Sequence, residues 1–461
     1  MTGGGAVGSR LVVIGGGAAG MSAASAARRM DPAAEIVVLE AGQYVAYGVC
    51  GIPYFLAGVV ERPEDLLAYP QQYFREKRRI DLRLGAAVTA LDPGRHTVRY
   101  RQGGEDVSLR YHRLIVAAGS RPIVPPLPGL DDDMVFTVRS LADAITLRSQ
   151  LDAGRIGRAL IVGGGYIGLE MAEALHARGA SVTVVEMLPQ VMPNVDPEVA
   201  DLVEAEVRRH GVDLRLRTRL EQVRRENGRL AAVVSGPNGV SSLSVDAVIL
   251  AVGVRGDGGV AAAAGAATEP GGALLVDEGM RTSLPDVFAC GDCIAPQHLV
   301  LGRPAFVPLG PMANKTGRVA GTVAAGGQAA FRGIVGTAVV KVFDLAVART
   351  GLTFAEAEAE RLSPVATDVV GRSRAKYYPG SSPVTMRLVH GEGGRVLGAQ
   401  LVGSDVAKRI DVIAVALQAG FSVDDLAALD LSYAPPYAPV YEAVLLAAQA
   451  AAAPVRVGAA R

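Results

Sequence analysis

Cys50 is the residue whose type and place in the sequence point first to chemistry. It lies in the stretch Tyr47 to Tyr54, shortly after a Gly-rich loop from Gly15 to Gly20, and no other cysteine precedes Cys290. A thiol close to a nucleotide-binding loop can exchange electrons with a bound redox cofactor. Because no second cysteine is nearby, it cannot form a local intrachain disulfide. The alternative is a buried structural cysteine, the commoner role of a free thiol.

Two Gly-rich loops of one kind occur in the chain. Each follows a short apolar run, opens a helical stretch and precedes a glutamate by about twenty residues, which is the dinucleotide-binding pattern. The first set is Gly15, Gly17, Gly20 and Glu40, and the second is Gly163, Gly165, Gly168 and Glu186. The glycines let a pyrophosphate approach the helix N-terminus, and each glutamate is expected to bind a ribose. Because Met187 and Leu188 offer no cation to a 2′-phosphate, the second loop favours NADH over NADPH.

Gly291-Asp292 is a further nucleotide signal, because it directly follows an apolar run at 287–290. A carboxylate at such a strand end can bind the ribityl hydroxyls of a flavin, or it can merely close a turn. Together with the two loops, it indicates that the first loop binds FAD and the second NADH. Cys290 and Cys293 flank the motif. Without a second cysteine pair they are interpreted as structural, and we expect no metal site.

The elements that must position these residues alternate between apolar runs and Ala-rich helical stretches. This pattern predicts an α/β fold with two Rossmann-like dinucleotide-binding domains, one for FAD and one for NADH. Beyond about residue 325 there is no third Gly loop. Strands are expected at 336–343, 385–389 and 396–402, and helices near 408–419 and 440–452. We therefore expect a C-terminal α+β dimerisation domain.

The predicted domains follow from these patterns. They are the first part of the FAD-binding domain at 10–122, the NAD(P)H-binding domain at 123–246, the second part of the FAD-binding domain at 247–328 and the dimerisation domain at 329–461.

Composition narrows the class of protein. Lys plus Arg and Asp plus Glu are both 46, so neither nucleic acid nor an anionic membrane surface is an expected partner. No apolar run reaches the roughly 20 residues that span a bilayer. Three cysteines fit a reducing cytoplasm, and the Gly-rich first ten residues, expected to form a loose tail, lack the apolar core of a signal peptide.

The chain resembles the single-cysteine branch of the flavin-dependent pyridine nucleotide–disulfide oxidoreductases. That branch holds coenzyme A disulfide reductases, NADH oxidases and peroxidases, and coenzyme A-dependent sulfur or persulfide reductases. The resemblance covers about residues 10 to 450. Besides both Gly loops and Gly291-Asp292, the motifs that carry it are Ser120-Arg121-Pro122, Pro308-Leu309-Gly310, Ala313-Asn314-Lys315, Tyr377-Tyr378-Pro379-Gly380, Lys408 to Val412 and Tyr433 to Tyr437. It implies a homodimer with cofactor contacts at Gly119, Gly253 and Ala313.

Within this resemblance Cys50 has the position of the redox cysteine. The short helix expected at 51–56 favours a thiolate through its dipole. Tyr377 and Tyr433 align with two tyrosines that reach the redox cysteine from the partner subunit and assist a departing coenzyme A thiolate. Their alternative role is that of ordinary core or interface aromatics.

Four basic residues align with those that bind the phosphates of coenzyme A, and a solvated helix face explains them equally well. They are Arg28, Arg29, Lys77 and Arg78.

The resemblance implies an enzyme whose substrate is a small molecule, either coenzyme A disulfide or a related small disulfide or persulfide, which it reduces. The alternatives are an NADH oxidase that reduces oxygen through a cysteine sulfenic acid, a ferredoxin-type reductase and a redox sensor. Ala18 stands where the peroxidases and water-forming oxidases carry a histidine, which argues against peroxide chemistry. The segment Tyr437 to Tyr441 lacks the serines and the acid usual in the family, so substrate preference can differ.

Overall fold

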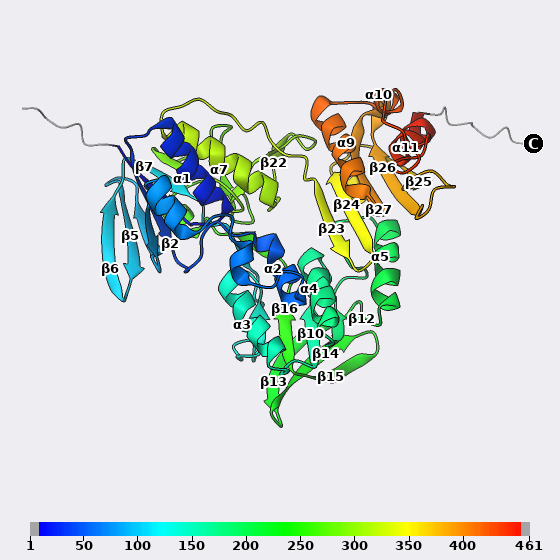
Figure 1. The fold of residues 1–461 in the computed structure, drawn as a ribbon, viewed down its shortest axis with the longest axis horizontal. Helices are drawn as coiled ribbons and strands as arrows, with labels where there is room; N and C mark the ends of the chain where they lie inside the picture. Colours follow the sequence, from blue (N-terminus) through cyan, green and yellow to red (C-terminus); the bar gives the residue numbers. More distant parts are fainter. Residues whose placement is uncertain (1–8, 453–461) are drawn as a thin grey trace, which may run out of the picture.

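The computed structural model describes residues 9–452. Most of the expected N-terminal tail and the last residues of the 329–461 segment lie outside the described residues. The described chain forms two parallel-sheet units and an antiparallel C-terminal unit (Figure 1). The predicted fold class is confirmed.

The first unit is built on a parallel five-stranded sheet with the order β19-β7-β1-β2-β3. Its strands are β1 (Arg10–Ile14), β2 (Glu35–Glu40), β3 (Asp81–Leu84), β7 (Arg113–Val116) and β19 (Val287–Ala289). Most of their residues are buried, as a parallel sheet with helices over its faces requires. Two of the covering helices, α1 (Ala18–Met30) and α7 (Gly310–Ala324), lie against each other. A Cβ atom at Gly317 or Gly321 would collide with the backbone of α1.

The second unit repeats the same arrangement. Its sheet has the order β9-β16-β10-β11-β12. The strands are β9 (Val135–Thr137), β10 (Arg158–Val162), β11 (Ser181–Val185), β12 (Asp213–Arg215) and β16 (Ala247–Leu250), and the helices are α3 (Leu141–Asp152), α4 (Tyr166–Ala177) and α5 (Pro197–Arg209).

Each unit also carries a three-stranded antiparallel sheet that the sequence analysis does not predict. These sheets are β4 (Ala87–Asp92), β5 (Thr97–Gln102) and β6 (Glu105–Arg110) in the first unit, and β13 (Arg219–Glu226), β14 (Arg229–Gly236) and β15 (Gly239–Val245) in the second. Many of their residues are polar and exposed, so they lack the continuous apolar runs that mark the central strands. The pair β8 (Ser120–Pro122) and β17 (Val254–Gly256) links the two units.

The C-terminal unit is a five-stranded antiparallel sheet with the order β23-β24-β27-β26-β25. Its strands are β23 (Ala338–Val342), β24 (Leu345–Gly351), β25 (Val365–Arg372), β26 (Pro383–His390) and β27 (Val396–Gly403), and its helices are α9 (Val406–Ala419), α10 (Val423–Ala427) and α11 (Ala443–Ala452). The three expected strands and both expected helices are present. Two further strands, β24 and β25, and the short α10 were not predicted.

Short elements complete the described chain. They are α2 (Ile52–Ala57), α6 (Gly259–Ala263), α8 (Phe354–Ala359), β18 (Leu274–Leu275), β20 (Ile294–Ala295), β21 (Gln297–His298), β22 (Arg303–Pro304) and the single-turn segments η1 (Val49–Gly51), η2 (Pro63–Leu66), η3 (Tyr73–Lys77) and η4 (Glu392–Gly394).

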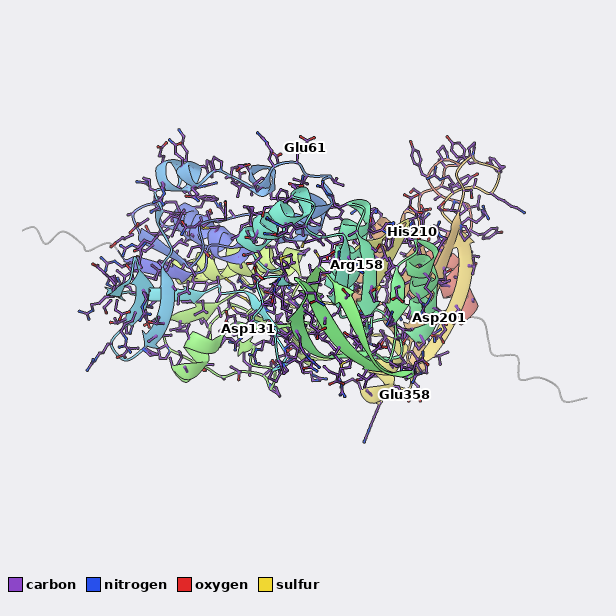
Figure 2. All side chains as sticks on the ribbon, turned by 90° about the horizontal axis from the view of Figure 1, so that it is seen from below. Glu61, Asp131, Arg158, Asp201, His210 and Glu358 are labelled. Carbon is purple, nitrogen blue, oxygen red and sulfur yellow. The ribbon has the colours of Figure 1, made fainter. Side chains whose placement is uncertain are left out.

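A buried polar network joins the second unit to the C-terminal unit. Asp196, just before α5, accepts hydrogen bonds from Gln400 Nε2 at 2.5 Å and from Arg387 Nε at 3.1 Å, and all three side chains are buried. At the other end of α5, Arg209 binds both Glu206 and Asp344 at 2.8 Å. Figure 2 shows His210 at this end of the helix. These bonds hold the second unit against the C-terminal sheet.

Over residues 9–452, no helix combines the length and the apolar character that a bilayer crossing needs.

Candidate active site

A cavity of about 2260 Å³ lies where the two parallel-sheet units meet, and it reaches the C-terminal unit at Val340 and Ile410. This volume is well above the roughly 300–1,000 Å³ of an ordinary single-ligand pocket. It brings together most of the predicted site residues, namely Gly15, Gly17, Glu40, Cys50, Gly119, Gly163, Gly165, Glu186, Gly253, Asp292 and Ala313. Gly20 and Gly168 are not among the residues that line it.

The glycines of each loop divide into two roles. A Cβ atom on Gly15 would collide with the carbonyl of Ala117, and one on Gly20 with the carbonyl of Gly15 itself. At these two positions the packing of the protein backbone itself leaves no room for a side chain. A Cβ atom on Gly17 would meet no protein atom within 4 Å. It would point into open space, so Gly17 leaves room for a ligand rather than for the chain.

The second loop repeats this division. Gly163 and Gly168 face neighbouring carbonyls, whereas a Cβ atom on Gly165 would again meet nothing within 4 Å. Both loops thus keep a glycine free beside the N-terminus of a long helix, where backbone N–H groups favour a phosphate.

Each predicted ribose-binding glutamate is held by backbone N–H groups. Glu40 accepts hydrogen bonds from Gly16 at 2.6 Å and from Gly42 at 2.7 Å. Glu186 accepts them from Gly164 at 2.7 Å and from Leu188 at 2.8 Å. A carboxylate has further lone pairs, so each remains able to bind a diol.

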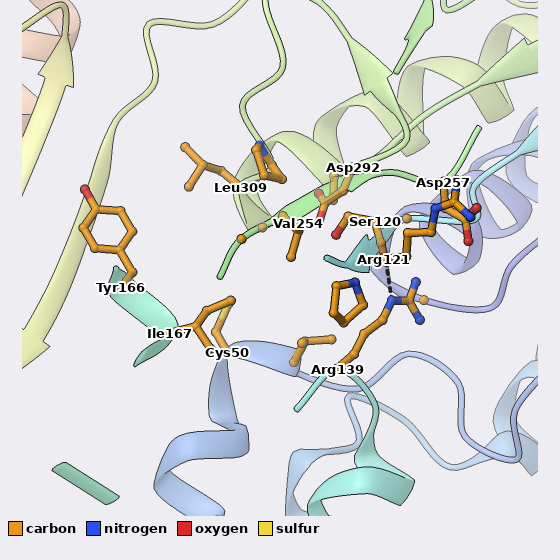
Figure 3. A pocket seen from close by; sticks show the side chains of 18 of the residues that line it. Cys50, Ser120, Arg121, Arg139, Tyr166, Ile167, Val254, Asp257, Asp292 and Leu309 are labelled. Carbon is orange, nitrogen blue, oxygen red and sulfur yellow. Dashed lines mark hydrogen bonds between the residues drawn. The ribbon is translucent and has the colours of Figure 1, made fainter. Parts of the chain in front are cut away.

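Asp292 offers the cavity a buried oxygen that suits a polar ligand. Its Oδ1 atom is buried and has no hydrogen-bond partner among the described residues. Burial raises the pKa of this carboxyl, while Arg139 and a hydrogen bond from Ser120 oppose the rise. Figure 3 shows Asp292, Ser120 and Arg139 along one wall of the cavity. Since buried polar atoms are normally paired, this oxygen fits the ribityl hydroxyls of FAD.

Cys50 lies at the junction of the two units. Helix α2, which follows it, places Ile52, Phe55 and Leu56 in the core of the second unit. Arg148 of α3 binds the carbonyl of Phe55 at 2.5 Å. Cys50 is exposed, and Figure 3 shows it beside Ile167 of α4. Cys50 therefore belongs to the first unit by its place in the sequence, but the helix that follows it is held by the core of the second unit.

The expectation that the helix dipole yields a low-pKa thiolate is wrong for the protein alone. The pKa of Cys50 is raised, first by desolvation in the cavity and then by the negative charges of Glu170 and Asp292. Cys50 sits in the single turn η1, and α2 has only six residues, so its dipole is small. The opposing backbone hydrogen bond is the weakest of these causes.

Glu170 is a cavity residue that sequence reasoning missed. It lies on α4, which begins at the second Gly loop, and it lines the cavity with Cys50 and Tyr166. Burial, followed by the charge of Glu173, raises its pKa to about 7. The available signal was helical spacing, because residues 166, 167 and 170 share one face of a helix.

The predicted tyrosines lie away from this cavity. Tyr377 and Tyr433 are 75% and 49% exposed, and their hydroxyl oxygens are 3.5 Å apart. They meet each other but not Cys50 of the same chain.

The predicted coenzyme A cations also lie outside the cavity. Arg28 is buried and donates hydrogen bonds to the carbonyls of Arg78, Pro32, Ala34 and Arg79. It is therefore a structural residue. Arg29 is exposed, and the guanidinium of Arg78 lies over the ring of Tyr73 at 5.4 Å.

The remaining cysteines are inaccessible. Cys290 and Cys293 are fully buried, and Cys293 Sγ donates to the carbonyl of Cys290 at 3.2 Å. Burial raises the pKa of Cys293 to about 12. Neither thiol is a nucleophile at neutral pH.

Comparisons with known proteins agree with this geometry. Residues 9–328 match the family described as "Pyridine nucleotide-disulphide oxidoreductase", and residues 337–444 match its dimerisation domain. The chain is 38% identical to an NAD(P)H coenzyme A polysulfide/persulfide reductase of Pyrococcus horikoshii, over 92% of this chain and 94% of that protein.

Three solved structures are also similar to this chain. An NAD-dependent persulfide reductase from A. fulgidus superposes with a TM-score of 0.92 at 39% identity, covering 95% of this chain and 82% of that one. A water-forming NADH oxidase from Lactobacillus brevis, bound to NADH, superposes at 0.91 with 29% identity, covering 96% and 98%. An engineered NADPH-using variant of that oxidase gives the same TM-score, identity and coverage.

Glu170→Gln tests the electrostatics of the site. Because the folded pKa of Glu170 is raised from 4.5 to about 7, stability falls as pH rises through this window and stays lower above it. The variant should therefore gain up to about 3 kcal/mol above pH 7 and little at pH 4 in chemical denaturation.

The same variant should also react faster at Cys50, because a negative charge that raises the thiol pKa has been removed. Alkylation of Cys50 by iodoacetamide would be followed from pH 7 to 10, with Asp201→Asn on the exposed face of α5 as the matched control. Identical alkylation profiles for Glu170→Gln and the parent would contradict this account.

Proposed function

Because the chain belongs to the pyridine nucleotide-disulphide oxidoreductase family, we propose that it is a cytoplasmic FAD-dependent enzyme that passes electrons from NADH to Cys50. Cys50 in turn reduces the disulfide of coenzyme A, or of a related small thiol or persulfide. One observation carries this proposal. Cys50 is the exposed thiol of a cavity reached by both Gly loops, whereas Cys290 and Cys293 are fully buried.

The residues of the two loops bind and orient the cofactors. Gly17, Glu40 and Asp292 would hold FAD, and Gly165 and Glu186 would hold NADH. When bound, FAD supplies the two-electron link between nicotinamide and thiol. The protein contributes position and charge, and it keeps Cys50 between the two units.

One cysteine is sufficient for a catalytic cycle in which atoms and electrons balance. Two electrons from NADH break the S–S bond between Cys50 and a bound small thiol, leaving the Cys50 thiolate and a free thiolate that takes a proton. Cys50 then attacks the next disulfide, releases a second thiol and restores the mixed disulfide. Each cycle converts one NADH, one proton and one disulfide into NAD⁺ and two thiols.

Tyr377 and Tyr433 are proposed to donate the proton across a homodimer interface. The dimerisation-domain match at 337–444 and the exposure of both side chains support this assembly. The hydrogen bond with Tyr433 raises the pKa of Tyr377. Its phenol therefore stays protonated at neutral pH and is able to donate to a departing thiolate.

A surface beside the cavity is suited to the nucleotide of coenzyme A. Tyr69 and Tyr73 stack with ring centroids 4.5 Å apart, and Arg78 covers Tyr73. The Nε atom of Arg78 is buried and has no partner among residues 9–452. Backbone pairing between Tyr47 and Leu67 joins this surface to the segment before Cys50. We propose Arg78 of this surface as one phosphate-binding residue, and the exposed Arg29 in the last turn of α1 as a second.

Cys50→Ser tests the central thiol. The variant should retain FAD and be reduced by NADH, because the residues that bind both cofactors are intact. It should lose turnover with coenzyme A disulfide, since serine cannot form the mixed disulfide. Stopped-flow absorbance would follow flavin reduction, and a thiol reagent would follow product. Cys290→Ser, which alters a buried thiol, is the matched control and should keep its turnover.

The same assay distinguishes the reductase from a second candidate function, that of an NADH oxidase. The similarity to the Lactobacillus brevis oxidase supports this second candidate. Oxygen uptake would be recorded beside thiol release. Ala18, where a histidine would be expected for that chemistry, argues against it. Disulfide turnover that survives in Cys50→Ser, or NADH oxidation that consumes oxygen in preference to disulfide, would refute the reductase proposal.

The preference for NADH rests on Glu186 and the residues after it. The engineered NADPH-using variant of the Lactobacillus oxidase changes a glycine, an acid eighteen residues later, the next two residues and a proline five beyond them. The same spacing in this chain selects Gly168, Glu186, Met187, Leu188 and Pro193. Four of these, all but Gly168, line the cavity.

Glu186→Ala combined with Met187→Arg, Leu188→Ser and Pro193→Arg should shift kcat/KM toward NADPH by on the order of 100-fold, or about 3 kcal/mol. The carboxylate that repels a 2′-phosphate is removed, and two guanidinium groups replace apolar side chains. Gly168 is left unchanged because a Cβ atom there would collide with Gly163. Glu198→Ala, outside the cavity, is the control. An unchanged NADH preference would show that these residues do not set coenzyme choice.

A further inference from the structure

Two loops of the C-terminal unit carry the paired tyrosines. The loop at 373–382 joins β25 to β26 and holds Tyr377, and the loop at 428–442 joins α10 to α11 and holds Tyr433. Neither side chain is buried, so the core does not fix where the phenols lie. A backbone hydrogen bond from Ala375 N to the carbonyl of Pro435, at 3.2 Å, ties the start of the first loop to the middle of the second.

One buried guanidinium lies beneath both loops. Arg409 of α9 is 8% exposed, and it forms an ion pair with Glu442, which is 6% exposed. Arg409 also donates to the carbonyl of Ser373 at 2.8 Å and to that of Asp405 at 2.8 Å. Ser373 begins the first loop and Glu442 ends the second. A single side chain therefore sets the distance between the bases of the two loops.

Glu442 is fixed in turn. Its second oxygen accepts a hydrogen bond from Val444 N at 2.7 Å, in the first turn of α11. Glu442 directly follows the segment 437–441, so this chain does carry an acid here, one residue beyond the segment judged to lack it. The Arg409–Glu442 pair is thus bonded to both loops, to the first through the carbonyl of Ser373 and to the second through Glu442 itself.

We propose that Arg409 is a positioning residue, which holds Tyr377 and Tyr433 at the spacing that proton donation requires. It acts through the carbonyl of Ser373 and the carboxylate of Glu442. This inference rests on the proposed role of the tyrosines. Lysine cannot replace Arg409, because a single ammonium nitrogen does not span three acceptors in separate directions as a guanidinium fork does.

The fold should survive the loss of Arg409. The first loop is also closed by Arg372, which binds Ser381 Oγ at 2.7 Å and its carbonyl at 2.9 Å, and by Ser382 N, which binds Ser373 Oγ at 3.1 Å. The second loop continues into α11, whose Val444 and Ala447 lie in the core. Removing Arg409 alone would leave Glu442 buried and unpaired. The test variant is therefore Arg409→Met with Glu442→Gln.

The experiment is a double-mutant cycle on the FAD-loaded enzyme. Arg409→Met/Glu442→Gln is made in the parent and in Tyr377→Phe/Tyr433→Phe. Coenzyme A disulfide turnover and flavin reduction by NADH are measured separately. In the parent, disulfide turnover should fall about tenfold or more, since small misplacements of reacting groups cost that much. Flavin reduction should not change. Lys408→Met, the exposed neighbour on α9, should change neither rate.

In the background without the two phenols, the same change should have no further effect on turnover. An equal loss in both backgrounds would overturn the positioning role and leave Arg409 merely structural. If Tyr377→Phe/Tyr433→Phe itself keeps full turnover, the proposed function of the tyrosines fails, and this inference fails with it. Should the double variant not fold, Arg409→Lys provides the same comparison, because it keeps the charge at Glu442 but not the bond to Ser373.

Discussion

The site depends on one contact made twice, the hydrogen bond from a loop glycine N–H to the carboxylate at the end of the next strand. Gly16 binds Glu40 and Gly164 binds Glu186 at nearly equal distances. Each bond ties the loop to the end of the strand that follows it in the sequence, β2 in the first unit and β11 in the second, so the free N–H groups of the following helix face the ligand space. Because both units are built in this way and face one cavity, two nucleotides can be held with their reactive ends toward a common point.

Cys50 occupies that point because its helix crosses between the units. The thiol is encoded just after the second strand of the first unit, yet Ile52, Phe55 and Leu56 are buried in the second. The interior that positions the thiol also desolvates it and places Glu170 beside it, so the protein alone raises its pKa. A resting mixed disulfide fits these surroundings, because a sulfur bonded to another sulfur carries no charge to desolvate.

Local patterns were enough to predict the duplicated fold and to select both loops, both glutamates and Asp292, which the structure brings to one cavity, while their roles toward the cofactors stay predictions. Each of these follows from residues within about twenty positions of one another. What could not be predicted depends on distant contacts. Glu170 and Cys50 line one cavity although 120 positions of sequence separate them. Arg409 pairs with Glu442 across 33 positions, and Arg28 is bonded to the carbonyls of Arg78 and Arg79. The polar small sheets lacked the apolar runs by which central strands are recognised, and the six-residue α2 was too short to supply the expected dipole effect.

Intact-protein mass spectrometry tests the central claim most directly, namely that Cys50 alone forms a disulfide with a small thiol. The FAD-loaded enzyme would be incubated with coenzyme A disulfide and weighed before and after NADH, beside Cys50→Ser. The account predicts one added coenzyme A moiety per chain, lost on reduction by NADH and absent from Cys50→Ser. An adduct that persists in Cys50→Ser, or a parent enzyme that never gains one, would contradict it.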